Sequence, residues 1–157
     1  MTERLTKRYL VRNLGNLELS NPIRYERYYI KDTLRIQKKG EKLEKEILNE
    51  KNVVINKKEI PIEEFNELKK RAYQKIIRDS YLYLKDNRIS IKKYYEEYEG
   101  LNRVEVNFAS KEELENFKKE PWMGEEITNS PLAFDKFLSK MTKQEFTSEL
   151  AKYLGEK

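Results

Sequence analysis

Alternation of apolar and polar residues predicts β-strands along most of this chain. The clearest example is RVEVNF at residues 103–108, where three apolar side chains face one way and the residues between them face the other. Alternating or tyrosine-rich segments predict further strands at residues 24–30, 33–37, 43–49, 81–84 and 89–95. A basic segment that becomes apolar towards Val11 predicts one more strand near the start of the chain.

Two short polar segments predict β-hairpin turns. Residues 38–41 join the strands at 33–37 and 43–49, and Gly40 supplies the positive φ that such a turn needs. Residues 85–88 join the next pair of strands in the same way. Because hairpins connect antiparallel neighbours, these turns predict an antiparallel sheet.

Helical spacing of apolar residues predicts three helices, at residues 61–72, 110–119 and 142–154. The second and third open with a capping box, a Ser or Thr followed three residues later by Glu. The third carries Phe146, Leu150 and Leu154 on one stripe, which we expect to dock on the same domain. Residues 121–132 are predicted to form a loop, in which Trp122 belongs to the core.

These elements indicate an α+β protein in which antiparallel strands outnumber helices. The pattern fits a β-barrel or strongly curved sheet with helices outside it, although periodicity alone favours a simpler two-layer sheet. The 157 residues suit one domain, 1–157, because a second domain of ordinary size would not fit and no internal repeat divides the chain.

The composition removes several kinds of chemistry. The sequence contains no Cys and no His. It therefore has no thiolate or disulfide chemistry, and it lacks the commonest transition-metal ligand and the usual general base near neutral pH. Any reaction would have to rely on carboxylates, Lys, Arg, Tyr or a hard cation held by oxygen ligands.

The charge and hydropathy of the chain describe a water-exposed surface. Lys and Arg number 33 against 28 Asp and Glu, for a net charge of +5. Such a mixture indicates an anionic partner only if the basic residues converge on one face. No apolar run approaches the ~20 residues that span a bilayer, and Met1–Tyr9 contains no apolar signal core. We therefore expect a cytoplasmic protein with no membrane partner.

Five short motifs occur in a characteristic order over residues 4–140. Their sequences are RLTKRYLV at 4–11, ERYYI at 26–30, EIPIEEF at 59–65, RVEVNF at 103–108 and PWMGEEIT at 121–128. In this order and spacing the chain resembles the CYTH family of triphosphate-tunnel proteins, whose corresponding motifs include E-I-E-R-K-F-L-V, L-V-E-V-E-F and P-x-W-x-G-x-E-V-T. The last motif matches best.

The resemblance implies a fold and a kind of site. CYTH proteins form an eight-stranded antiparallel β-barrel, the tunnel, with flanking helices, and they hydrolyse triphosphates or cyclise ATP. Inward basic side chains neutralise the triphosphate, while carboxylates hold Mg²⁺ or Mn²⁺. Strand alternation places every second residue of such a motif in the tunnel.

Most acidic positions of the family's metal site are replaced in this chain. The residues that stand there are Arg4, Thr6, Ser90, Lys92, Glu105 and Asn107. A cation beside a metal site costs about 4 kcal/mol at ~4 Å and an effective dielectric of about 20. We therefore expect no metal cofactor, with Mg²⁺ or Mn²⁺ required only if the chain is an active enzyme.

The same resemblance implies which residues bind phosphate. The candidates are Arg4, Arg8, Arg35, Lys75, Arg78 and Lys92. The alternative is that they are surface cations or partners in internal ion pairs. A relocated metal site would use Glu44, Glu46, Glu59 and Glu105, unless these glutamates pair with the inward basic residues.

Three functions remain open at this point. The leading hypothesis is a tunnel protein that binds a phosphate-rich ligand, a nucleotide or polyphosphate, without metal-dependent catalysis, as a sensor or sequestering protein. The second is a divergent metal-dependent triphosphatase or class IV type adenylyl cyclase. The third is a module that binds nucleic acid on an outer basic patch. Tyrosine stacking on a base would favour a nucleotide, although burial in the strands is the simpler interpretation of Tyr28, Tyr29, Tyr81, Tyr83, Tyr94 and Tyr95.

Overall fold

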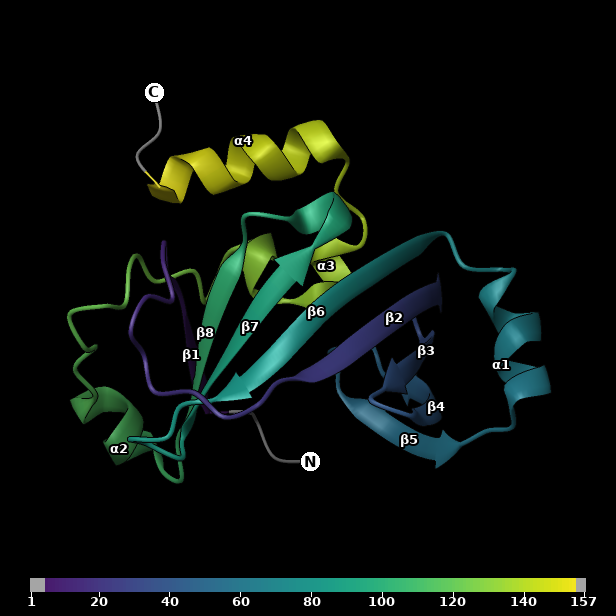
Figure 1. The fold of residues 1–157 in the computed structure, drawn as a ribbon, viewed down its shortest axis with the longest axis horizontal. Helices are drawn as coiled ribbons and strands as arrows, with labels where there is room; N and C mark the ends of the chain where they lie inside the picture. The colour runs from purple at the N-terminus through teal and green to yellow at the C-terminus, as the bar shows by residue number, and fades with distance from the viewer. Residues whose placement is uncertain (1–4, 155–157) are drawn as a thin grey trace.

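A computed structural model describes residues 5–154, which form one eight-stranded antiparallel sheet with flanking helices (Figure 1). The strands are β1 (Thr6–Leu10), β2 (Ile23–Lys31), β3 (Leu34–Lys39), β4 (Lys42–Leu48), β5 (Val54–Glu59), β6 (Gln74–Leu82), β7 (Ile89–Tyr95) and β8 (Asn102–Asn107). The helices are α1 (Ile62–Lys69), α2 (Lys111–Asn116), α3 (Asp135–Leu138) and α4 (Lys143–Leu154), with short 3₁₀ turns η1 (Glu96–Tyr98) and η2 (Pro131–Ala133). None of the helices in this part of the chain is long and apolar enough to cross a membrane. The predicted α+β fold, with an antiparallel eight-stranded sheet, is confirmed.

The sheet curves into a tunnel-like shape that is open along one side. Its strand order is β1-β8-β7-β6-β2-β3-β4-β5, and within residues 5–154 no ladder joins β1 to β5. The edge of β1 that closure requires is bonded instead to residues 124–127: the Leu10 amide donates to the Glu125 carbonyl at 2.9 Å, and the Ile127 amide donates to the Arg8 carbonyl at 2.8 Å. The expected closed barrel is therefore an open, curved sheet, because the loop takes the hydrogen bonds of that edge.

Apolar packing on the outside of the sheet leaves its inner face to polar side chains. Helix α1 places Phe65 edge-on to Tyr28, with ring centroids 5.8 Å apart, on the outer side of β2 and β3. On the outer side of β7 and β8, Ile91 and Val104 are fully buried beside Trp122 of the loop after α2. Trp122 is thus part of an outer core, as predicted. Because strand residues alternate between faces, burying one set outward directs the intervening residues inward.

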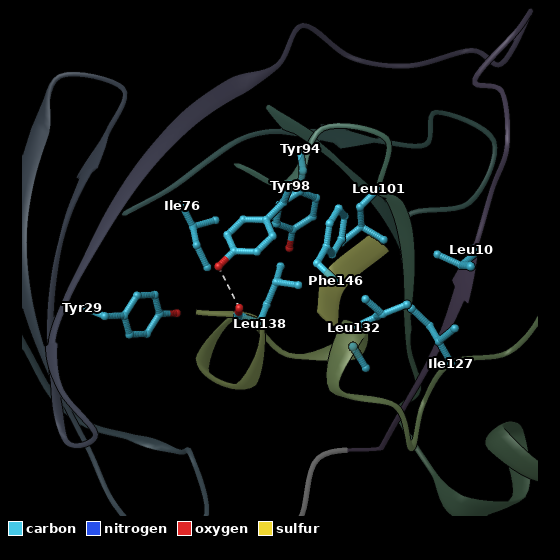
Figure 2. Packing of buried hydrophobic residues seen from close by; sticks show 11 residues of the cluster. Leu10, Tyr29, Ile76, Tyr94, Tyr98, Leu101, Ile127, Leu132, Leu138 and Phe146 are labelled. Atoms are coloured by element: carbon cyan, nitrogen blue, oxygen red, sulfur yellow. Dashed lines mark hydrogen bonds between the residues drawn. The ribbon is translucent and has the colours of Figure 1, made fainter. Parts of the chain in front are cut away.

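A third apolar cluster closes one end of the curved sheet. It contains the plug segment, residues 131–138, which comprises η2 and α3. Figure 2 shows Tyr98 donating a hydrogen bond to the Leu138 carbonyl, at 2.8 Å. Phe146 of α4 packs edge-on to Tyr98 at 5.2 Å, so the C-terminal helix docks on this domain and supports the plug.

Some elements follow from sequence pattern and others do not. The hairpin of β3 and β4 turns at Gly40, whose φ is +60°. Strand β6 spans nine residues, and alternation predicts only its end. Its two faces are not distinguished by polarity, because Ile76 and Ile77 are buried on opposite faces. The next two residues, Arg78 and Asp79, are both ion-paired. Strand β5 is mostly exposed, so it lacks the alternation that marks a half-buried strand.

We predict that Gly124→Ala destabilises the fold. A Cβ at this position would lie 2.8 Å from the Leu10 carbonyl oxygen, and the Gly124 amide donates to that same oxygen at 2.6 Å. Overpacking of this kind costs about 1–3 kcal/mol of the free energy of unfolding. Urea titration measures the loss, with the exposed neighbour Glu125→Ala as control. Equal stability of the two variants would show that the contact between this loop and β1 is not close.

Candidate functional site

The inner face of the sheet surrounds a strongly cationic cavity. The cavity has a volume of about 590 Å³, and among its lining residues in the described chain eight are Lys or Arg and two are Asp or Glu. The deeper cations come from six different strands: Arg8, Arg27, Arg35, Arg78, Lys92 and Arg103. Strand alternation brings these six side chains to one space, which is the convergence that an anion site requires.

A carboxylate of the plug segment lies at the inner end of the cavity and offsets part of the positive charge there. Asp135 is buried, and its oxygens lie 3.0 Å from Arg27 and Arg78 and 3.3 Å from Arg103. Tyr94 also donates a hydrogen bond to this carboxylate. Burial by itself raises the pKa of Asp135, but the three guanidinium groups outweigh it and hold that pKa well below its usual range. Asp135 is therefore a permanent internal anion.

A second group of ion pairs lines the side of the cavity formed by β3 and β4. Arg35 donates to Glu46 at 2.7 Å, and Gln37 donates to Glu44 at the same distance. Both glutamates are buried, and Lys57 lies 3.3 Å from Glu46. Both carboxylates are thus engaged by protein groups.

On the opposite side of the cavity, among residues 5–154, one carboxylate pairs with two basic side chains. Glu105 lies 3.4 Å from Arg8 and 3.9 Å from the Lys92 ammonium, which donates to Ser90 at 2.6 Å. Burial lowers the pKa of Lys92 to about 7; Glu105 opposes this shift, whereas Arg78 adds to it. A bound anion would stabilise the charged form of Lys92 and raise its pKa again.

The carboxylates of residues 5–154 do not assemble a metal site. Glu44 and Glu46 lie on β4, Glu105 lies on the opposite side next to two cations, and Glu59 is 70% exposed near Lys42. Among the described residues no group of three or more Asp or Glu side chains could hold a metal ion. A divalent cation needs several oxygen ligands at once, so the residues at hand do not fit one.

The cavity includes four of the six residues predicted to bind phosphate. These are Arg8, Arg35, Arg78 and Lys92. Lys75 points outward and pairs with Glu96 at 3.0 Å, since it is an odd number of positions from Arg78 on the same strand. Arg4 lies outside the described residues. Alternation could have found Arg27 and Arg103, which share faces with Tyr29 and Glu105, whereas no periodic pattern marks Asp135.

The tyrosines mostly serve the core. Tyr28, Tyr29, Tyr83 and Tyr94 are all at most 5% exposed, which agrees with the simpler interpretation of burial. Tyr25 lines the cavity and lies beneath the Arg78 guanidinium, 4.3 Å from it. Cation–π contact of this kind orients the guanidinium without neutralising it.

Comparison with known proteins bears on the fold. No protein-family model and no curated protein matches the sequence. Two crystal structures of one protein are similar: one described as the hypothetical protein NE1496 (TM-score 0.74, 20% identity, 89% of this chain and 99% of that one) and one as the inorganic triphosphatase NE1496 (TM-score 0.73, 20% identity, 90% and 97%). The chain therefore has the tunnel-type fold that its resemblance to CYTH proteins predicts.

We predict that Asp135→Asn strongly destabilises the protein. The substitution leaves three guanidinium groups, two of them buried, without their carboxylate, and breaking a buried ion pair costs about 3–5 kcal/mol. Because the pKa of Asp135 is depressed, this contribution is fully present above the unfolded-state pKa of ~3.9 and is lost as the pH falls through the lower folded-state value.

Urea titration of the variant measures the loss, and Asp32→Asn, which removes an exposed ion pair with Lys140, is the matched control. We expect added sulfate or phosphate to restore part of the stability of Asp135→Asn by replacing the missing anion. Unchanged stability of the variant would contradict the role assigned to this carboxylate.

Proposed function

We propose that this protein binds a phosphate-rich anion, a polyphosphate or the phosphates of a nucleotide, in the cationic cavity, as a sensor or sequestering protein. The observation that carries the proposal is the charge of the cavity lining, eight Lys or Arg against two Asp or Glu of the described residues. Guanidinium groups suit phosphate because their planar fork bonds two oxygens at once. The fold that the chain shares with a protein described as an inorganic triphosphatase gives further support.

The proposal assigns no metal-assisted cleavage to the cavity. Glu105 and Asp135, the carboxylates that line the cavity in the described chain, are paired with Arg8 and with three further arginines respectively. The chain has no His to act as a base, and the cations around the cavity would hold a phosphate without orienting a water molecule to attack it. Binding is therefore the function that these side chains support best.

Lys92→Met gives the sharpest test of anion binding. The substitution removes a charge that burial already disfavours, so we expect the variant to fold at least as stably as the parent. It also removes a charge-assisted hydrogen bond of about 1.5–3 kcal/mol to the ligand, which corresponds to roughly 10–100-fold in Kd. Isothermal titration with sodium tripolyphosphate in the presence of EDTA measures the change.

Lys75→Met is the matched control, because it removes the same charge from the outer surface of β6. Equal affinity of the parent and of Lys92→Met for tripolyphosphate would contradict the assignment of the cavity as the binding site. Phosphate release by the parent with Mg²⁺ or Mn²⁺ would favour the triphosphatase. Binding of RNA that grows with its length and collapses in salt would favour the outer patch.

We predict that ligand binding takes up a proton on Lys92. In the free protein its pKa is about 7, whereas a phosphate in contact would return it towards the ordinary value of ~10.4. The affinity should therefore fall as the pH rises above 7, by up to about tenfold per unit. Without ligand, and between pH 7 and the ordinary lysine pKa of ~10.4, Lys92 binds more protons in the unfolded chain than in the folded one. Raising the pH through this window therefore increases the free energy of unfolding as far as Lys92 is concerned.

Carbon-13 NMR of the lysine Cε atoms checks this directly. One resonance should titrate near pH 7, disappear in Lys92→Met, and titrate well above pH 8 once tripolyphosphate is bound. A parent protein in which every lysine titrates at its ordinary pKa, with and without ligand, would contradict the prediction.

A further inference from the structure

One lysine of the cationic cavity differs from the other seven basic residues that line it. Each of those seven pairs with an Asp or Glu of the described chain; they are Arg8, Arg27, Arg35, Arg78, Arg88, Lys92 and Arg103. The remaining one is Lys39 of β3. Within residues 5–154 its ammonium forms no ion pair, and it lies over the ring of Tyr25 instead, 5.7 Å from the centroid.

Tyr25 lies on the inner face of β2, between two strands that each place a cation opposite it. Its Cα partners in the two ladders are Lys39 of β3 and Arg78 of β6. The centroid of its ring is 4.3 Å from the Arg78 guanidinium carbon and 5.5 Å from that of Arg27, two residues further along β2. The register of the sheet therefore gathers cations from three strands around one aromatic ring.

Two of these three cations have a second contact that fixes them. Arg27 and Arg78 both donate hydrogen bonds to Asp135 of the plug segment. For Lys39, the ring of Tyr25 is the side-chain contact that the described chain provides. Because a lysine ammonium is carried on a flexible four-carbon stem, its position in the cavity would vary without that ring.

An aromatic ring holds a cation in a different way from a carboxylate. The ring attracts the ammonium through its quadrupole but carries no net charge, so the full positive charge of Lys39 remains available to an anion. Lys39 also lies towards the exposed end of the cavity. Ile23, two residues before Tyr25, lines the same cavity and is 46% exposed.

We propose that Tyr25 is a positioning residue, whose ring holds the Lys39 ammonium in the cavity as a charge that no carboxylate of residues 5–154 offsets. The inference rests on the proposed function, since it needs an anion to bind in the cavity. It adds Lys39 to the groups that contact the anion. It also explains why an aromatic residue, and not an acidic one, faces Lys39 and Arg78 across the two ladders.

Isothermal titration with sodium tripolyphosphate in EDTA measures the contribution of Lys39. We expect Lys39→Met to weaken binding by about tenfold, because it removes a charge-assisted hydrogen bond to the anion. Lys38→Met is the matched control. It removes the same charge from the neighbouring residue of β3, which faces the other side of the sheet and does not line the cavity, so it should bind nearly as tightly as the parent.

Substitutions of Tyr25 separate the ring from its hydroxyl group. Tyr25→Leu should weaken binding by about two- to fivefold, and the conservative variant Tyr25→Phe, which keeps the ring, should restore it. Replacing Tyr25 with 3,4,5-trifluorophenylalanine keeps nearly the shape of phenylalanine but withdraws the negative charge from the face of the ring. If the ring acts through the cation–π contact, this variant should bind as weakly as Tyr25→Leu.

Proton NMR reports the contact in the absence of ligand. The ring current of Tyr25 should move the Lys39 Hε resonances upfield in the free parent, because these protons lie beside the face of the ring. The shift should persist in Tyr25→Phe and vanish in Tyr25→Leu. Thermal unfolding confirms that the variants are folded.

The outcomes distinguish the inference from the proposed function. Equal affinity of the parent and Lys39→Met, equal affinity of Tyr25→Phe and the fluorinated variant, or Lys39 resonances that do not change in Tyr25→Leu would overturn the inference while the proposed function stands. Failure of tripolyphosphate to bind the parent would overturn the proposed function and the inference with it.

Discussion

The carboxylate of Asp135 and the three guanidinium groups around it are the interaction on which this structure depends. Arg27, Arg78 and Arg103 come from β2, β6 and β8 and converge inside the curved sheet. Like charges ~4 Å apart cost about 4 kcal/mol each at an effective dielectric of about 20, so three such groups need an anion among them. The plug segment supplies it and thereby closes one end of the tunnel. The apolar cluster beneath, with α4 outside it, keeps that carboxylate in place.

The carboxylate of Asp135 divides the inner face into two parts. At the inner end it offsets one of three positive charges, and a ligand would have to displace this buried carboxylate in order to take its place between the arginines. Nearer the open side Glu105 pairs with both Arg8 and Lys92, and burial lowers the pKa of Lys92 to about 7. Binding of a phosphate there needs no rearrangement of the plug. The loop that covers β1 keeps the sheet open beside this part.

Much of the fold could be predicted from the sequence, and part of the site could too. Strand alternation located most of the sheet, and the motif at 121–128 led to the tunnel-type fold. Applied strictly, alternation also separates inward Arg78 from outward Lys75, and it would have found Arg103. Asp135 was beyond prediction, because a short helix in a loop has no period and its burial depends on contacts distant in sequence. The open edge of the sheet could not be predicted for a similar reason, because the pairing of β1 with the loop depends on tertiary contacts between segments distant in sequence.

A crystal structure grown with tripolyphosphate and EDTA would show where the anion binds. We expect phosphoryl oxygens bonded to Arg8 and Lys92 inside the curved sheet, with Asp135 still bound by its three arginines and no metal ion between ligand and protein. An interior that stays empty of ligand at saturating concentration, with the anion bound to the outer surface instead, would contradict this expectation.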